Sequence, residues 1–116
     1  MEGKNKGGIS DAELKKLKEE NGSALRCGSI EDQDNPAKRH YFYFKEVDKD
    51  LYNRCMALMF DKQLTKAQTT FHAHAVLWEE PALTSATGGQ RDKYIMGIGR
   101  FIGDSYKVPE ARLEEI

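Results

Sequence analysis

The sequence has little cysteine, little proline and no long apolar run, and these absences exclude several kinds of protein. Its 116 residues include two cysteines, Cys27 and Cys55, which are too few for a disulfide scaffold. We interpret them as ordinary buried thiols. The longest apolar run, residues 55–60, is far too short to span a bilayer, and the opening residues MEGKNKGG lack the apolar stretch of a signal peptide. We therefore expect a cytoplasmic location and no contact with a membrane.

Net charge is also nearly absent. The 18 basic and 19 acidic residues give a formal charge of −1, whereas proteins that bind duplex nucleic acid usually carry a clear basic excess. Nucleic acid is therefore not the favoured partner. The length is that of a single domain. We expect residues 1–8, which are rich in glycine and lysine, to form a flexible tail, and residues 9–116 to form one domain.

What the sequence does contain is an aromatic strand. Residues 39–46 include four consecutive aromatic side chains, which are favoured in strands. Because a strand alternates its faces, Phe42 and Phe44 are predicted to point into the core, and Tyr41 and Tyr43 to lie on a partly wet face. Residues 24–30 predict a second strand, which pairs with the first as an antiparallel hairpin.

Four helices are predicted around this hairpin. Capping signals at Ser10, Asp48 and Thr65 open helices over residues 10–21, 49–60 and 65–78, and a fourth covers residues 91–103. The fold class is therefore α+β, with a short antiparallel β-hairpin packed on a bundle of about four helices. Met59 is placed on the inner face of the second helix. The predicted core is one cluster of large side chains: Phe42, Phe44, Leu51, Cys55, Leu58, Phe71, Ala75, Trp78, Ile95, Ile98 and Ile102.

No pattern in the sequence predicts catalysis, a cofactor or a metal. His72 and His74 are the metal candidates, but on a helix positions two apart point about 200° away from each other. His40 is interpreted as a solvated residue at a strand edge. The segment GIGRFIG, residues 97–103, lacks the register of a phosphate-binding loop, and its glycines indicate a helix packed closely against another backbone. A nucleophile elbow is missing as well, so we predict a protein that is not an enzyme.

The predicted function is therefore binding to another protein. The expected surface is the outer face of the hairpin together with the loop of residues 83–90, because tyrosines offer a large contact area at a small entropic cost. The candidate residues are the two outward tyrosines and the basic residues beside them: Tyr41, Tyr43, Lys38, Arg39 and Lys45.

The order of these elements resembles the tail assembly chaperones of long-tailed bacteriophages. Those proteins have a lysine-rich first helix, a strand ending in Tyr-Phe-Lys, and two core helices, of which the second runs into an aromatic residue. The resemblance covers about residues 10–100, and Val47 stands where the family has a proline. The matching residues are Tyr43, Phe44, Lys45, Asp48, Leu51, Arg54, Ala57, Ala67, Leu77 and Trp78.

The resemblance implies a virion-assembly function in the host cytoplasm. Such a chaperone keeps the tape measure protein soluble before the tail polymerises, and it recruits tail tube subunits. The alternative, from a different class, is a small inhibitor or adaptor of phage or bacterial origin that binds one folded target protein. The two hypotheses differ in the partner, which is an extended apolar client in the first and a folded surface in the second.

Overall fold

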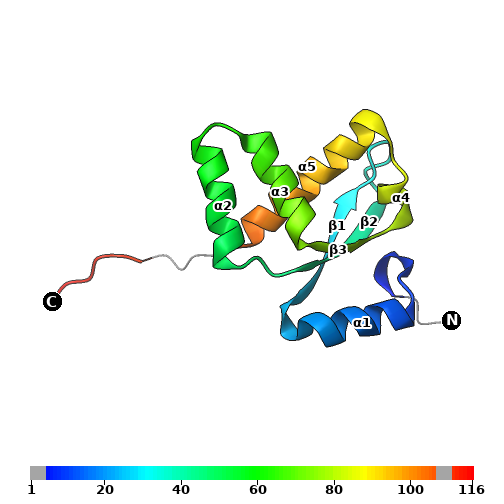
Figure 1. Ribbon diagram of the computed structural model, residues 1–116, viewed down its shortest axis with the longest axis horizontal. Helices are drawn as coiled ribbons and strands as arrows, with labels where there is room; N and C mark the ends of the chain where they lie inside the picture. The colour runs from blue at the N-terminus through cyan, green and yellow to red at the C-terminus, as the bar shows by residue number, and fades with distance from the viewer. Residues whose placement is uncertain (1–4, 107–110) are drawn as a thin grey trace.

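A three-stranded antiparallel sheet separates two groups of helices in the computed structural model, which describes residues 5–106 and 111–116 (Figure 1). The strands lie in the order β1 (Leu25–Glu31), β2 (Arg39–Lys45) and β3 (Val76–Glu79). One face carries α2 (Lys49–Phe60), α3 (Leu64–Ala75) and α5 (Gly88–Ser105), and the other carries α1 (Asp11–Asn21). Three short helical turns complete the chain: η1 (Lys6–Gly8), η2 (Gly22–Ala24) and α4 (Pro81–Thr84). The predicted α+β class, with a hairpin packed on helices, is confirmed.

Side-chain caps begin two of the helices where the sequence predicts them. The hydroxyl of Ser10 accepts a hydrogen bond from the backbone N–H of Glu13 at 3.1 Å, which opens α1. The carboxylate of Asp48 accepts from the N–H of Leu51 at 2.8 Å, which opens α2. Each cap satisfies a backbone donor that has no partner within its own helix.

One predicted helix is a helix followed directly by a strand. The expected helix over residues 65–78 ends at Ala75, and Val76–Glu79 pairs antiparallel with β2. The expected cap at Thr65 is also wrong, because α3 begins at Leu64 and no side chain caps it. Valine and tryptophan favour strands, and the aromatic strand β2 otherwise keeps one edge of unpaired backbone groups. Hydrogen bonding to that edge of β2 therefore favours a strand at residues 76–79, although the apolar spacing there also suits a helix.

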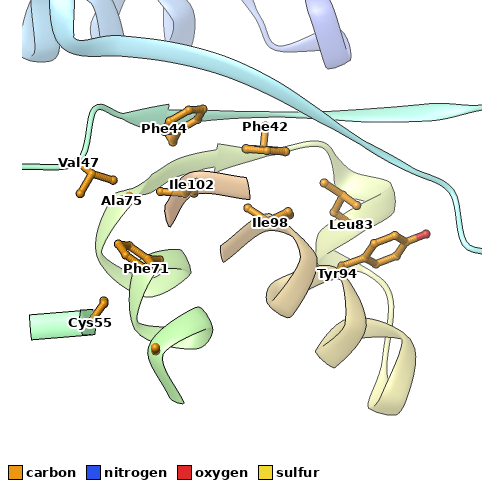
Figure 2. Packing of buried hydrophobic residues seen from close by; sticks show 11 residues of the cluster. Phe42, Phe44, Val47, Cys55, Phe71, Ala75, Leu83, Tyr94, Ile98 and Ile102 are labelled. Carbon is orange, nitrogen blue, oxygen red and sulfur yellow. The ribbon is translucent and has the colours of Figure 1, made fainter. Parts of the chain in front are cut away.

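The core lies between the sheet and the helices α2, α3 and α5. Phe42 and Phe44 point from β2 toward Ile98 and Ile102 of α5, as predicted (Figure 2). The buried cluster consists of Phe42, Phe44, Val47, Cys55, Ala67, Phe71, Ala75, Leu83, Tyr94, Ile98 and Ile102. Four of these were not predicted: Val47, Ala67, Leu83 and Tyr94.

Four residues of the predicted core lie elsewhere. Leu51 and Leu58 are partly buried and pack against the side of the cluster, and Ile95 is half-buried. Trp78 belongs to the opposite face of the sheet, because its position became part of β3 instead of a helix. There its ring meets the ring of Tyr43 edge-on, with centroids 5.8 Å apart.

The two cysteines differ from each other. Cys55 of α2 is fully buried, as predicted, whereas Cys27 of β1 is exposed, and both are free thiols. Cys27 pairs with Tyr43 across the hairpin, so it lies on the sheet face opposite the core. The prediction of a buried thiol is therefore wrong for Cys27.

The N-terminal segment is more ordered than the predicted tail where the structure describes it. Residues 1–4 of that predicted tail lie outside the described residues. Residues 5–8 contain the turn η1, and the side-chain amide of Asn5 donates to the carbonyl of Ile9 at 2.9 Å and to Asp11 at 2.8 Å. Ile9 is buried beside this turn.

The glycines of α5 allow its backbone to approach α3. A Cβ atom at position 99 would lie 1.9 Å from the carbonyl oxygen of Gln68, and one at position 103 would lie 2.8 Å from the ring of Phe71. Both distances are below any normal non-bonded contact. The expectation of a helix packed closely against another backbone is therefore confirmed, and α3 is the helix that it contacts.

We predict that Gly99→Ala destabilises the protein by about 1–3 kcal/mol, because two helix backbones must move apart to admit one methyl group. Gly89→Ala is the matched control in the same helix, since nothing lies within 4 Å of a Cβ at that position. It should be neutral or stabilise by up to about 1 kcal/mol through helix propensity. Chemical denaturation measures both, and equal effects of the two substitutions would contradict the close contact.

Candidate functional site

The predicted partner-binding residues lie along one face of β2, but that face is partly covered. Tyr43 is 6% exposed, and its hydroxyl donates to the backbone carbonyl of Lys6 at 3.0 Å. Tyr41 is half-buried. The expected wet face is therefore wrong for Tyr43, which is covered by the N-terminal turn and by Trp78.

A glycine makes this cover possible. Gly7 has a backbone φ of +77°, a conformation that residues with a side chain rarely adopt. A Cβ atom there would lie 3.0 Å from the Cβ of Tyr41 and 3.1 Å from the ring of Trp78. The turn η1 therefore rests directly on the aromatic side chains, and a bulkier residue would force it away.

The other predicted binding elements are only partly available. Lys38, Arg39 and Lys45 are exposed, and Arg39 donates from Nε to the hydroxyl of Ser29 at 2.8 Å. The predicted loop of residues 83–90 is largely ordered, because the fully buried Leu83 belongs to α4 and α5 already begins at Gly88. A binding role for the five residues stays a prediction.

A buried histidine lies near the start of β2. His40 is 1% exposed, and each ring nitrogen contacts a carboxylate. Nε2 is 2.8 Å from Asp32 in the turn after β1, and Nδ1 is 2.5 Å from Glu80 at the end of β3. The interpretation of His40 as a solvated residue is therefore wrong. The residues next to His40 in the sequence give no sign of this contact, because Glu80 is 40 positions away.

The two carboxylates decide the protonation of this imidazole. Burial by itself lowers the pKa of His40, but the hydrogen bonds that its ring donates to Asp32 and Glu80 outweigh burial and raise the pKa above its usual 6.5. The same contact with His40 holds the pKa of Asp32 below its usual value. Because both ring nitrogens are engaged, neither is free to exchange a proton with a substrate. The arrangement fits a structural link between strands.

A second charged cluster joins β3 to α5. The carboxylate of Glu79 accepts two hydrogen bonds from Arg91, at 2.7 and 2.9 Å, and lies 3.0 Å from Nε2 of His72. Burial raises the pKa of Glu79, but Arg91 and His72 outweigh it and lower that pKa to about 2. Arg91 also donates to the carbonyl of Leu83 at 3.0 Å, so one guanidinium holds three segments together.

The second predicted metal candidate has a different neighbour. His74 is exposed on α3, and its Nε2 is 3.4 Å from a guanidinium nitrogen of Arg54 in α2. His72 and His74 thus point to different elements, as their helical spacing predicts. In the part of the chain that the structure describes, no three His, Cys, Asp or Glu side chains are grouped so that they could hold a metal.

Sequence reasoning did not predict an apolar groove that the helices form on the surface. It lies between α2, α3 and α5, holds about 260 Å³, and is called the α2/α3/α5 groove below. Small-molecule sites usually span about 300–1,000 Å³, so the volume suits a few side chains better than a cofactor. Its lining comes from all three helices: Tyr52, Met56, Met59, Leu64, Ala67, Gln68, Phe71, Gly99, Arg100, Gly103, Asp104 and Tyr106.

The close contact between α3 and α5 shapes the floor of the groove. Gly99 and Gly103 present backbone instead of side chains, and Phe71 and Ala67 complete an apolar base. Tyr52 and Tyr106 stack at one end, with ring centroids 4.1 Å apart. Within the described residues, the amide oxygen Oε1 of Gln68 is buried there without a hydrogen-bond partner.

Exposed apolar side chains lie at the α2 and α3 walls of the groove. Met59 and Leu64 line it and are 41% and 52% exposed, and Phe60, next to Met59, is 87% exposed. Met59 was expected on the buried face of α2, so that expectation is wrong. Adjacent exposed large hydrophobics of this kind typically mark a binding surface. In the sequence, Met56, Met59 and Phe60 at the end of α2 were the residues that could have indicated this surface.

Comparison of the chain with protein-family models, with curated proteins and with solved structures finds no match. The site therefore rests on its geometry alone. None of the helices that the structure describes has both the length and the apolar character needed to cross a membrane.

We predict that the free energy of unfolding falls as pH rises above about 6.5, because the folded protein holds the His40 proton more tightly than the unfolded chain. This contribution is complete below 6.5 and disappears as pH passes the raised pKa of folded His40. The slope reaches at most about 1.4 kcal/mol per pH unit. Denaturation series between about pH 6 and pH 7.5 measure it, because free thiols, with a pKa of about 8.5, stay mostly protonated in that range.

Two variants decide whether His40 is the source of this slope. His40→Gln should flatten it, whereas His74→Gln, at an exposed position on α3, should keep the parent slope. A parent protein with equal stability across the range would show that the two carboxylates do not raise the pKa of His40.

Proposed function

We propose that this protein is a non-catalytic, cytoplasmic protein-binding module that holds an apolar helical segment of another protein in the α2/α3/α5 groove. The observation that carries the proposal is this groove, which the exposed side chains of Met59 and Leu64 line, with the exposed Phe60 next to Met59 in the sequence. Helix-in-groove recognition places apolar residues of one helical face into such a hollow.

The energetics support a binding role for this surface. Burying one large apolar side chain is favourable by roughly 1.5–3 kcal/mol, and Phe60 and Leu64 are both largely exposed. Methionine adapts its shape to different contacts, so Met56 and Met59 suit a groove that accepts more than one sequence. A charged exterior around the groove would keep a complex with an apolar client in solution.

The resemblance to phage tail assembly chaperones suggests one particular client. A tape measure protein is long and exposes apolar helical stripes before assembly, and several copies of a small chaperone would cover it through many weak contacts. Tail tube subunits would be the second partner. The matching residues of the resemblance occupy β2, β3 and the core helices, and Asp48 caps α2. They build the scaffold on which the groove lies.

We predict that Met59→Glu weakens the binding of an apolar helical client at least about tenfold, or 1.4 kcal/mol, because it places a charge in the groove. Leu77→Glu is the matched control, since Leu77 is also partly exposed but lies on β3, near α1. Fluorescence anisotropy with a labelled amphipathic peptide of leucine, alanine and lysine measures the affinity.

Co-expression with a tape measure fragment tests the specific client. The parent protein and Leu77→Glu should keep the fragment soluble, and Met59→Glu should not. If the parent fails as well, the tape measure is not the client. If the labelled peptide does not bind and a stoichiometric complex forms with one folded protein instead, the protein is an inhibitor or adaptor.

A further inference from the structure

A segment of the chain itself carries the chemistry that the groove would accept. Residues 111–116, with the sequence ARLEEI, have no regular secondary structure and extend away from the helices and sheet (Figure 1). Leu113 is 99% exposed and Ile116 is fully exposed, which makes them the most exposed large apolar residues described. Leaving an apolar pair in water is unfavourable when the same chain offers an apolar groove.

We propose that residues 111–116 fold back into the α2/α3/α5 groove and occupy it as an internal competitor of the client. The inference rests on the proposed function to the extent that both occupants use the same groove. The groove is a surface hollow, and in the closed arrangement Leu113 and Ile116 fill it.

The point of attachment supports this occupant. Tyr106 lines the groove and stacks on Tyr52 at one end of it, and Ala111 follows five residues later. Five residues span at most about 17 Å, whereas the groove from Tyr52 to Met59 extends over about 10 Å of α2. The segment can therefore reach the whole groove. Because the segment belongs to the same chain, its contact with the groove is intramolecular, so weak contacts can suffice.

The spacing of the apolar residues also fits. Leu113 and Ile116 are three positions apart, so in a helical turn they share one face and lie about 4.5 Å apart along the axis. Both then fit within the length of the groove.

The charged residues at the edge of the groove are complementary to those of residues 111–116, in the order in which the segment would meet them. Asp104 and Arg100 line it one helical turn apart on α5, with Asp104 nearer to Tyr106. A segment that returns from Tyr106 runs antiparallel to α5 and reaches Asp104 first. It presents Arg112 there, and Glu115 then lies toward Arg100. Both pairs are of opposite charge, whereas a segment running parallel to α5 would place like charges together.

The test uses the full chain and its methionine methyl groups. Met56 and Met59 line the groove, while Met96 of α5 does not, so Met96 is an internal reference. Leu113→Ser combined with Ile116→Ser should shift the ¹³C-methyl resonances of Met56 and Met59 and leave that of Met96 in place. Ala111→Ser, which changes neither an apolar anchor nor a charge of the segment, is the matched control and should shift none of them.

A charge exchange tests the direction of the segment. Glu115→Lys should reproduce part of the shift of the double serine variant, because it places two cations together. Adding Arg100→Glu to the same chain should restore the parent positions. Failure of this rescue would contradict the antiparallel placement.

Affinity and concentration distinguish the remaining outcomes. The double serine variant should bind the labelled leucine-alanine-lysine peptide about tenfold more tightly than the parent, since no competitor remains. If both bind it equally and the Met56 and Met59 signals do not move, the inference is wrong and the proposed function stands. If neither binds it, the proposed function fails separately. If the signals move but revert on dilution, a second copy supplies the segment, and the internal competitor is excluded.

Discussion

The approach of α5 to α3 depends on the absence of a side chain at position 99. The backbone of Gly99 meets the carbonyl of Gln68 where a methyl group would not fit, and Gly103 admits the ring of Phe71 in the same way. This contact fixes the rotation of α5, so that Ile98 and Ile102 face Phe42 and Phe44 of the sheet (Figure 2). The glycines inside α5 lower its intrinsic helix propensity, and tertiary packing offsets that loss.

The groove follows from the same contact. Because α5 lies so close to α3, its glycine backbone forms part of a floor, and α2 becomes the wall on the other side of α3. A larger residue at position 99 would separate the helices and change both the core and the groove. Stability and binding are therefore coupled in this protein through one pair of helices.

Local signals predicted the elements whose causes are local. The alternation of Phe42 and Phe44 with the two tyrosines, and the capping residues Ser10 and Asp48, each act over a few positions, and the structure agrees with them. The strand β3 was missed because its partner β2 lies more than 30 residues earlier, and an apolar run that ends a helix has no periodicity of its own.

The site was harder to predict for the same reason. His40 is buried only because Glu80 reaches it from the end of β3, and Tyr43 is covered only because Lys6 and Gly7 fold over it. The groove is made by three helices together, and no one helix shows it in sequence. The glycines of α5 did indicate close backbone packing, but they did not indicate that α3 is the helix that α5 contacts.

Consecutive carboxylates at the end of β3 connect to different parts of the protein. Glu79 binds Arg91 of α5 and His72 of α3, while Glu80 binds His40 of β2. The strand end is thus tied to both the helical layer and the sheet by charge-assisted hydrogen bonds, which are stronger than neutral ones. Removing one partner would leave a poorly solvated charge, so each cluster depends on all its members.

The single tryptophan of this chain lies on the sheet face away from the groove. Trp78 touches the turn around Gly7 and the ring of Tyr43, so its environment changes when the N-terminal segment detaches from the sheet. Its intrinsic fluorescence would therefore report the local opening of that segment, which can precede global unfolding. Occupants of the groove, which lies among the helices on the other side of the sheet, would leave this signal almost unchanged. The two faces of the molecule can thus be observed independently in one sample, without attaching a dye.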